Sequence, residues 1–321
     1  MLSEYKKQGG KLLEEFVLRT FGLTKRFGNK IAVNNVSINI RKGDIYGFIG
    51  PNGAGKTTAM KVVLDLMKPT SGEIELFGKL KNTTDLIRVG SLIESPGLYT
   101  ACSAYENMKR FSLLFGGTDE DIAFYLRMVG LESVGKKKVS AFSLGMKQRL
   151  GIAIALLGNP EFLILDEPVN GLDPMGMKDV RDIIQFVNRE KGVTLFISSH
   201  LLSELEKVAT VYGIINCGTL IEEITAEELE RRCASSIRVR CSEPQKAAAI
   251  IRENFGIEQI DISDNQILIP APPAISARVN EMLVKSEIQV SELGIQKVSS
   301  EDYFLSKMGS LNVGMGVGQY A

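Results

Sequence analysis

The stretch GPNGAGKTT at residues 50–58 constrains this chain more than any other part of its 321 residues. It fits the pattern G-x-x-x-x-G-K-[ST], in which a glycine-rich loop wraps around phosphate oxygens. The apolar segment DIYGFIG precedes it, and KTTAMKVVLDLM follows with apolar residues at helical spacing. This context predicts a strand, a phosphate-binding loop and a helix whose N-terminus adds positive potential. A purely structural glycine-rich turn is the weaker alternative.

The residues of this loop have expected roles toward a nucleoside triphosphate. Lys56 is expected to reach the β- and γ-phosphates, and Thr57 to ligate Mg²⁺. Gly50 and Gly55 lack a Cβ, which lets the loop wrap closely around the phosphate oxygens. The predicted nucleotide-binding residues of the loop are Gly50, Pro51, Asn52, Gly53, Ala54, Gly55, Lys56, Thr57 and Thr58.

Two carboxylates end the apolar segment FLILDEP at residues 162–168. Asp166 is expected to bind Mg²⁺, and Glu167 to orient and deprotonate an attacking water. Buried carboxylates at a strand end are costly without a cation, which favours a metal beside them. The alternative is an acid pair that only caps the strand, and the phosphate loop in the same chain weakens that alternative.

His200 is the only histidine and ends the apolar segment VTLFISSH. Parallel sheets bind ligands at the carboxyl ends of their strands, so we expect its ring to contact the γ-phosphate and the attacking water. A structural histidine is the alternative. Lys56, Glu167 and His200 are therefore the predicted catalytic residues. Asp173, in NGLDP at 170–174, is expected to cap the next helix, and a link between two active sites is the further possibility.

Strands that alternate with helices predict a layered α/β domain over residues 16–228, after a polar leader at 1–15. Residues 229–308 instead suggest a βαββαβ order, which is typical of a small ferredoxin-like α+β domain. This accessory domain is expected to serve packing or dimerisation, with a ligand sensor or a permease contact as alternatives. Residues 309–321 form a glycine-rich tail that is expected to be mobile.

Composition narrows the environment. Lys and Arg together number 38, as do Asp and Glu, so the net charge gives no indication of a nucleic-acid partner. None of the four cysteines forms a CxxC pair, which predicts free thiols in a reducing cytosol. The start lacks the apolar core of a secretory signal, and no apolar run approaches the ~20 residues of a membrane helix. We therefore expect a chain soluble by itself, with any membrane part supplied by another subunit.

The segment FSLGMKQR identifies a family, because it follows the phosphate loop and precedes the FLILDE strand. This order resembles the ATP-binding cassette (ABC) ATPases, in which a Ser-Gly signature at a helix start binds the γ-phosphate held by a second copy of the domain. The resemblance gives these roles to Ser143 and Gly145. Leu144 stands where the first glycine of the signature usually lies, and Met146 replaces the common glutamine.

The resemblance covers roughly residues 16–225 and implies a parallel-sheet core, an antiparallel β subdomain and a helical subdomain. It implies that Phe27 stacks on adenine, that His200 is the switch histidine and that Asp173 lies in the loop between the two sites. Glu94 stands where a glutamine usually contacts Mg²⁺ and the membrane subunit, so the implied Mg²⁺ ligands are Thr57, Glu94 and Asp166. Core packing for Phe27 and a simple loop acid for Glu94 are the alternatives.

Glu94, the SPGLY that follows it and the SLGMKQR signature together resemble the bacitracin and lantibiotic transporter branch. This implies the ATPase subunit of a bacterial exporter of peptide antibiotics or related drugs, on the cytoplasmic face of the membrane through a separate permease. Two identical or related cassettes would sandwich two ATP molecules with Mg²⁺. The rivals are a cassette ATPase that acts on nucleic acid or ribosomes, and a P-loop kinase. We expect no nucleic-acid partner.

Overall fold

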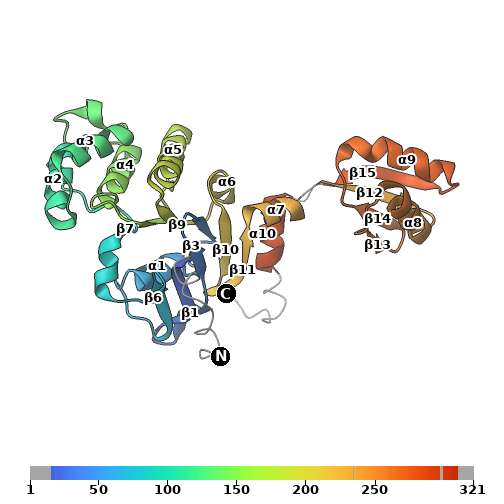
Figure 1. The fold of residues 1–321 in the computed structure, drawn as a ribbon, viewed down its shortest axis with the longest axis horizontal. Coiled ribbons are helices and arrows are strands. Elements are labelled where there is room, and N and C mark those ends of the chain that lie inside the picture. Colours follow the sequence, from blue (N-terminus) through green and yellow to red (C-terminus); the bar gives the residue numbers. More distant parts are fainter. Residues whose placement is uncertain (1–15, 234, 297–298, 310–321) are drawn as a thin grey trace, which may run out of the picture. The chain divides into compact units, whose positions relative to one another are not determined.

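The computed structural model describes residues 16–233, 235–296 and 299–309, so the predicted leader and nearly all of the predicted tail lie outside the described residues. The chain divides into two compact units, residues 1–226 and 227–321. Figure 1 shows both units and labels most of their helices and many of their strands.

The first unit is built on a six-stranded sheet in the order β11-β10-β4-β9-β8-β7. Its strands are β4 (Ile45–Ile49), β7 (Val89–Leu92), β8 (Phe162–Asp166), β9 (Thr194–Ser199), β10 (Val211–Asn216) and β11 (Thr219–Thr225). Neighbours from β7 to β10 run parallel, whereas β11 pairs antiparallel with β10. Every residue of β4, β8 and β9 is buried, because layers cover both faces of the sheet. Their carboxyl ends therefore meet at one edge.

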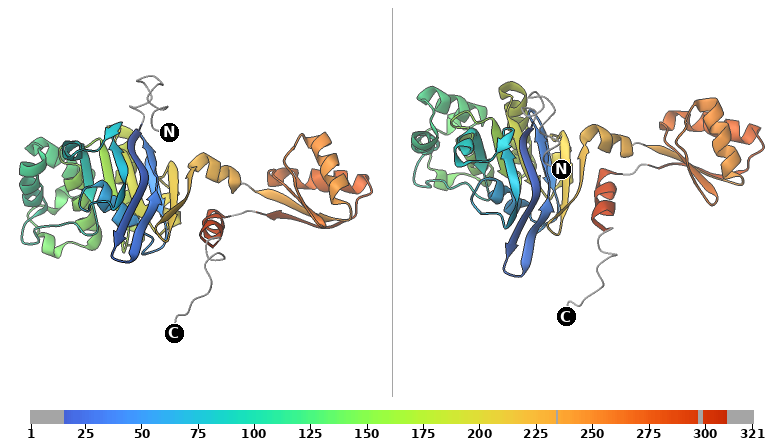
Figure 2. Two further views of the ribbon diagram at one scale, coloured as in Figure 1. Left: turned by 90° about the horizontal axis from the view of Figure 1, so that it is seen from below. Right: turned by 60° about the horizontal axis from the view of Figure 1, so that its bottom comes forward.

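A second, five-stranded antiparallel sheet packs nearby (Figure 2). Its strands are β1 (Phe16–Phe27), β2 (Lys30–Val36), β3 (Asn39–Arg41), β5 (Ser71–Leu76) and β6 (Lys79–Leu80). Helix α1 (Lys56–Val63) and both sheets share one apolar core, in which Leu18, Met60 and Phe48 are fully buried. This core fixes the start of α1 against the end of β4.

Helices cover the rest of the first unit. They are η2 (Thr83–Arg88), α2 (Ala104–Phe115), α3 (Asp119–Met128), η3 (Glu132–Val134), η4 (Val139–Ala141), α4 (Leu144–Ala155), α5 (Pro174–Lys191) and α6 (Leu202–Leu205). Capping boxes start α2 at Ser103 and α3 at Thr118, which satisfies N–H groups that the helices themselves leave free. Within the described residues, no helix combines the length and apolar character that spanning a bilayer requires.

Two local features differ from the sequence expectation. The helix expected over residues 56–67 ends at Val63, because Asp65 has φ +62 and the Leu66 and Met67 amides both bond to Lys61 O. The sequence analysis also did not predict the β10–β11 hairpin. Its two-residue turn has positive φ at Cys217 and Gly218, which matches the right-handed twist of the flanking strands.

The second unit contains a four-stranded antiparallel sheet in the order β13-β14-β12-β15. Its elements are α7 (Ala226–Arg232, which begins at the boundary), β12 (Ser236–Cys241), α8 (Pro244–Phe255), β13 (Asp261–Ser263), β14 (Gln266–Ile269), η5 (Pro273–Ile275), α9 (Ser276–Lys285), β15 (Val290–Gln296) and α10 (Ser300–Gly309). Alternate residues of β12, Ile237 and Val239, are buried against Ile251 of α8 and Leu283 of α9. Strands and helices from β12 to β15 thus follow the order βαββαβ, the ferredoxin-like arrangement.

Candidate active site

The phosphate loop joins β4 to α1, and its glycines are required by close backbone contacts. A Cβ on Gly50 would lie 2.2 Å from Ile215 O, and one on Gly55 would lie 2.3 Å from Ala32 O. Gly53 has φ +80 with nothing within 4 Å of a Cβ, so the loop is open there. No side chain caps α1 at Gly55, which leaves its first N–H groups available to an anion. The loop therefore fits a phosphate group.

Lys56 lies inside this loop and is only 5% exposed. Its Nζ donates to Gly50 O at 2.6 Å and to Pro51 O at 3.2 Å. Its positive charge is balanced by Glu167, whose Oε1 lies 3.1 Å from Nζ. The loop and the carboxyl end of β8 are thus joined through one buried ammonium group.

Asp166 ends β8 with a buried carboxylate that accepts two hydroxyl hydrogen bonds. Thr57 Oγ1 donates to its Oδ2 at 2.8 Å, and Ser198 Oγ donates to its Oδ1 at 2.6 Å. Thr57 and Asp166, both predicted Mg²⁺ ligands, are therefore adjacent. The sequence analysis missed Ser198, and the signal that finds it is the parallel register of β8 and β9, which pairs Asp166 with Ser198.

Glu167 has φ +48, a left-handed conformation that costs a non-glycine residue about 1–2 kcal/mol. Strain of this kind gathers at functional sites. The Glu167 Oε2 atom lies 2.8 Å from Nδ1 of His200, and the Glu167 N–H donates to Ser198 Oγ at 2.9 Å. The three predicted catalytic residues, Lys56, Glu167 and His200, therefore form one chain of contacts centred on the Glu167 carboxylate.

Glu94 lies in a different setting. It also has positive φ, at +61, and its carboxylate pairs with Lys61 of α1 while its side chain stays 63% exposed. In the part of the chain that the structure describes, no three His, Cys, Asp or Glu side chains are arranged to hold a metal ion. Thr57 and Asp166 are the adjacent oxygen donors that would hold a Mg²⁺ ion. The role of Glu94 as a Mg²⁺ ligand stays a prediction.

Ser143 caps α4, and its Oγ accepts a hydrogen bond from Met146 N at 3.2 Å. Ser143 is exposed, Leu144 is 53% exposed, and Gly145 lies beside Leu172. Among the described residues, no hydrogen bond or ion pair joins Ser143, Leu144 or Gly145 to the phosphate loop of the same chain. The geometry leaves this turn open to a ligand that the same phosphate loop does not hold.

Two further predicted residues lie at the surface. Phe27 ends β1 with 47% of its surface exposed, and Lys25 Nζ lies 5.1 Å from its ring centroid, so core packing does not explain it. Asp173 caps α5 by accepting from Gly176 N at 3.1 Å, which is the structural role that the sequence indicated. Adenine stacking by Phe27 and a linking role for Asp173 stay predictions.

Comparisons with known proteins agree with this geometry. A family model described as ABC transporter matches residues 33–170, and one described as an AAA domain matches residues 135–206. BcrA of Bacillus licheniformis, a bacitracin transport ATP-binding protein, is 41% identical over 303 residues, which cover 93% of this chain and 99% of BcrA. The chain belongs to the ABC transporter ATP-binding protein family. This cassette is therefore an ATP-binding subunit of the ABC ATPase family, as the signature and phosphate loop predicted.

Two other proteins extend the comparison. SrtF of Streptococcus pyogenes, a lantibiotic transport ATP-binding protein, is 48% identical over 207 residues, which cover 64% of this cassette and 90% of SrtF. The dimeric structure of MJ0796, a bacterial ABC transporter cassette, has a TM-score of 0.59 at 25% identity and covers 65% of this cassette and 98% of that chain. The predicted fold of the ATPase domain is confirmed.

Proposed function

We propose that this cassette hydrolyses ATP, and that two cassettes closing around ATP drive a separate membrane permease. The observation that carries the proposal is the chain of contacts from Lys56 through Glu167 to His200, beside the Thr57–Asp166 pair. These groups meet at the carboxyl edge of a parallel sheet, where such sheets bind their ligands. The family of the chain supports the same activity.

The chemistry assigned to each residue follows from its contacts. The buried Lys56 ammonium meets β- and γ-phosphate oxygens, and moving it toward phosphate weakens its hold on Glu167. The freed Glu167 carboxylate then accepts a proton from the attacking water, while His200 orients that carboxylate through Nδ1. A Mg²⁺ ion held by Thr57 and Asp166 would neutralise charge on the phosphate oxygens. Catalysis is mainly positioning and charge neutralisation around the γ-phosphate.

The second part of each site comes from another cassette. Ser143 and Leu144 are exposed and are not bonded to the phosphate loop of their own chain. The structure of MJ0796 is described as dimeric, which supports a head-to-tail pair for this cassette. Each site would combine the Lys56 loop of one cassette with the Ser143 turn of the other. The partner is a second copy or a related cassette.

The transported class follows from the relatives. BcrA is named for bacitracin transport and SrtF for lantibiotic transport, so we assign this cassette to export of peptide antibiotics or related drugs. Its place is the cytoplasmic face of the membrane, through the permease. Exposed apolar side chains follow Glu94 in the chain and suit that contact. The Phe111 ring stacks on Phe115 and lies tilted against Tyr99, and Leu113 and Leu114 are exposed.

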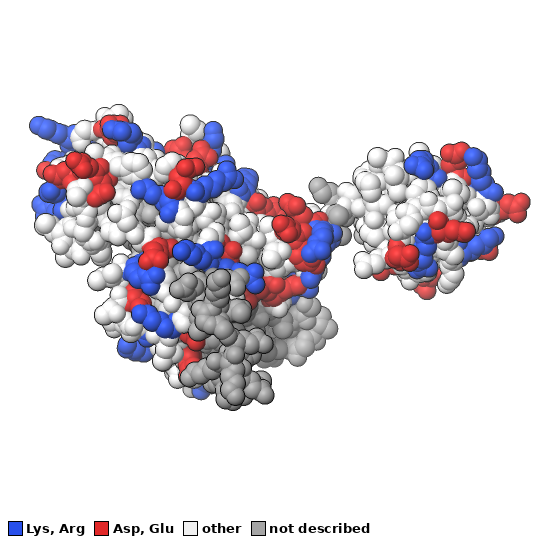
Figure 3. Space-filling view, in the orientation of Figure 1, with Lys and Arg blue, Asp and Glu red and all other residues white. Residues whose placement is uncertain are grey.

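Charge gives no support to a nucleic-acid target. Lys and Arg side chains alternate with Asp and Glu over the face drawn in Figure 3, and the whole chain carries 38 of each sign. Nucleic-acid binding instead requires positive charge gathered on one surface.

Mixing two inactive variants tests the shared site. Lys56→Ala removes the loop lysine, and Ser143→Arg blocks the signature turn, so each variant alone should lose at least about 95% of its ATPase activity. In a mixed head-to-tail pair, one site regains an intact Lys56 loop and an intact Ser143 turn. Mixing should therefore restore activity well above that of either variant. No restoration, together with full activity of Ser143→Arg alone, would contradict the proposal.

A further inference from the structure

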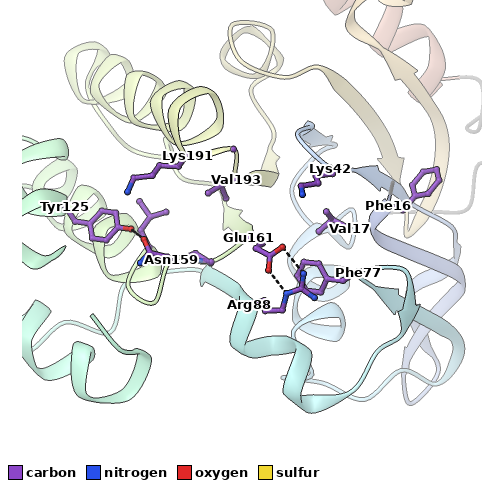
Figure 4. A pocket seen from close by; sticks show the side chains of 13 residues that line it. Phe16, Val17, Lys42, Phe77, Arg88, Tyr125, Asn159, Glu161, Lys191 and Val193 are labelled. Atoms are coloured by element: carbon purple, nitrogen blue, oxygen red, sulfur yellow. Dashed lines mark hydrogen bonds and ion pairs between the residues drawn. The ribbon is translucent and has the colours of Figure 1, made fainter. Parts of the chain in front are cut away.

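A cavity of about 860 Å³ lies at the opposite end of the parallel sheet from the candidate active site. Glu161 directly precedes β8, Val193 directly precedes β9, and Lys42 precedes β4, so all three mark the amino ends of parallel strands. Figure 4 shows the cavity between the helical part of the first unit, with Tyr125 and Asn159, and the antiparallel sheet, with Val17 and Phe77. The cavity is therefore separate from the phosphate loop.

One wall of the cavity is a preorganised ion pair. Arg88 donates to Glu161 through Nε at 2.6 Å and through Nη2 at 2.8 Å, and its guanidinium lies 3.5 Å from the centroid of the Phe77 ring. The hydrogen bonds from Arg88 lower the pKa of Glu161, and the charge of Lys42 adds to this effect. The wall thus presents a fixed cation on an aromatic face, with its carboxylate ionised at neutral pH.

Two more cations, Lys42 and Lys191, line the cavity. Their charges act on the carboxylates of Glu161 and Asp121 respectively. Within the described residues, neither ammonium group forms a close ion pair or a hydrogen bond, and both side chains are exposed. Lys191 instead lies over the Phe124 and Tyr125 rings, at 4.4 and 5.5 Å from their centroids. The charged lining residues are thus three cations, Lys42, Arg88 and Lys191, against the single anion Glu161.

The remaining wall is mixed in character. The Tyr125 hydroxyl donates to Asn159 Oδ1 at 2.7 Å, which fixes the ring at the edge of the cavity. Burial raises the pKa of Tyr125, so this hydroxyl stays protonated and adds no negative charge. The apolar lining residues are Phe16, Val17, Phe77, Leu156, Pro160 and Val193. Ligand sites combine such apolar walls with a few convergent polar groups.

We propose that this cavity binds a small organic anion, an aryl or alkyl phosphate or carboxylate, which the cationic lining residues Lys42, Arg88 and Lys191 attract. The apolar body of the ligand packs against the apolar lining residues. The excess of two positive charges among the lining residues selects an anion, and the apolar walls select one with a hydrophobic body. The cavity lies apart from the residues proposed for ATP hydrolysis, so a measurement of ligand binding tests it.

Calorimetry with phenyl phosphate as the probe tests the site on the full chain. A saturating non-hydrolysable ATP analogue keeps the phosphate loop occupied during the titration. Phenyl phosphate should bind one equivalent, with a dissociation constant in the low millimolar range or tighter. The double variant Lys42→Ser/Lys191→Ser should bind at least about tenfold more weakly, because two of the three cationic lining residues are lost.

A matched control is Lys136→Ser/Lys137→Ser, which removes the same charge from exposed lysines outside the cavity and should leave the affinity unchanged. Equal melting temperatures for the three proteins exclude unfolding as the cause. Inorganic phosphate and benzyl alcohol should each bind at least about tenfold more weakly than phenyl phosphate, since each lacks one half of the recognised chemistry. Absence of phenyl phosphate binding, equal affinity for inorganic phosphate, or unchanged affinity of the Lys42/Lys191 variant would each overturn the proposal.

Discussion

Ser198 and Asp166 are cross-strand neighbours whose side chains bond to each other inside the sheet. The Ser198 hydroxyl donates to Asp166 Oδ1 at 2.6 Å and accepts from the Glu167 N–H at 2.9 Å. Ser198 is fully buried and Asp166 is 3% exposed, so water cannot replace these bonds. One hydroxyl therefore positions two successive residues, the proposed Mg²⁺ ligand and the proposed general base.

We expect Ser198→Ala to lower kcat by about tenfold, with a smaller change in KM for ATP. The substitution leaves the buried Asp166 carboxylate with one hydrogen-bond partner fewer, a loss of about 1–3 kcal/mol. Ser198→Thr should retain more activity, because it keeps a hydroxyl. The matched control is Ser199→Ala in the same strand, because the Ser199 hydroxyl bonds with the backbone of Leu201. Steady-state kinetics in which both alanine variants behave alike would remove Ser198 from the site.

We expect Glu167→Gln to bind ATP and accumulate as a dimer while hydrolysis falls by about a hundredfold or more. An amide keeps the size of the side chain but cannot accept the proton of the attacking water, and a general base contributes about 10²–10⁴ in rate. Size-exclusion chromatography with ATP and a phosphate-release assay measure the two effects. Glu190→Gln, an exposed change on α5, is the control. Unchanged hydrolysis by Glu167→Gln would refute the assigned role.

Short-range sequence signals predicted much of this site. Each main signal lies beside a strand that the sequence pattern predicts. These signals are the loop glycines, the apolar run before Asp166 and the single histidine after β9, so their meeting at one edge of the sheet could be predicted. The contact of Ser198 with Asp166 and the Lys61–Glu94 pair could not be predicted in this way. Both depend on which strands and helices lie side by side, and a single sequence does not give that arrangement. The early end of α1 depends in the same way on the backbone at Asp65.

A comparison of Gly53 with Gly55 separates the cost of a steric clash from the cost of a positive φ. Gly53 and Gly55 both have positive φ, which costs alanine about 1–2 kcal/mol. Only at Gly55 would a Cβ also strike backbone, at 2.3 Å from Ala32 O, and overpacking adds typically 1–3 kcal/mol. We expect Gly55→Ala to lose clearly more unfolding free energy than Gly53→Ala in urea titrations. Equal losses would show that the loop shifts freely.

Glu204 should make part of the stability of the first unit depend on pH. Burial alone would raise the pKa of its carboxyl, but hydrogen bonds from Lys207 and Arg181 outweigh this and lower the pKa. A lowered folded-state pKa stabilises the native state at pH values above the unfolded pKa, about 4.3 for Glu. That contribution is lost as the pH falls through the folded-state pKa, because the unfolded chain then binds the proton more readily.

We therefore expect Glu204→Gln to destabilise the protein by about 1–3 kcal/mol at pH 7. At this pH the parent carboxylate is ionised and accepts hydrogen bonds from Lys207 and Arg181. The difference between variant and parent should shrink as the pH falls below about 4.3. Urea unfolding at a series of pH values measures it. Glu206→Gln, an exposed change two residues further along the chain, should cost less than about 0.5 kcal/mol. A Glu204→Gln deficit that stays constant down to the lowest pH at which both proteins fold would show that the carboxylate charge contributes nothing.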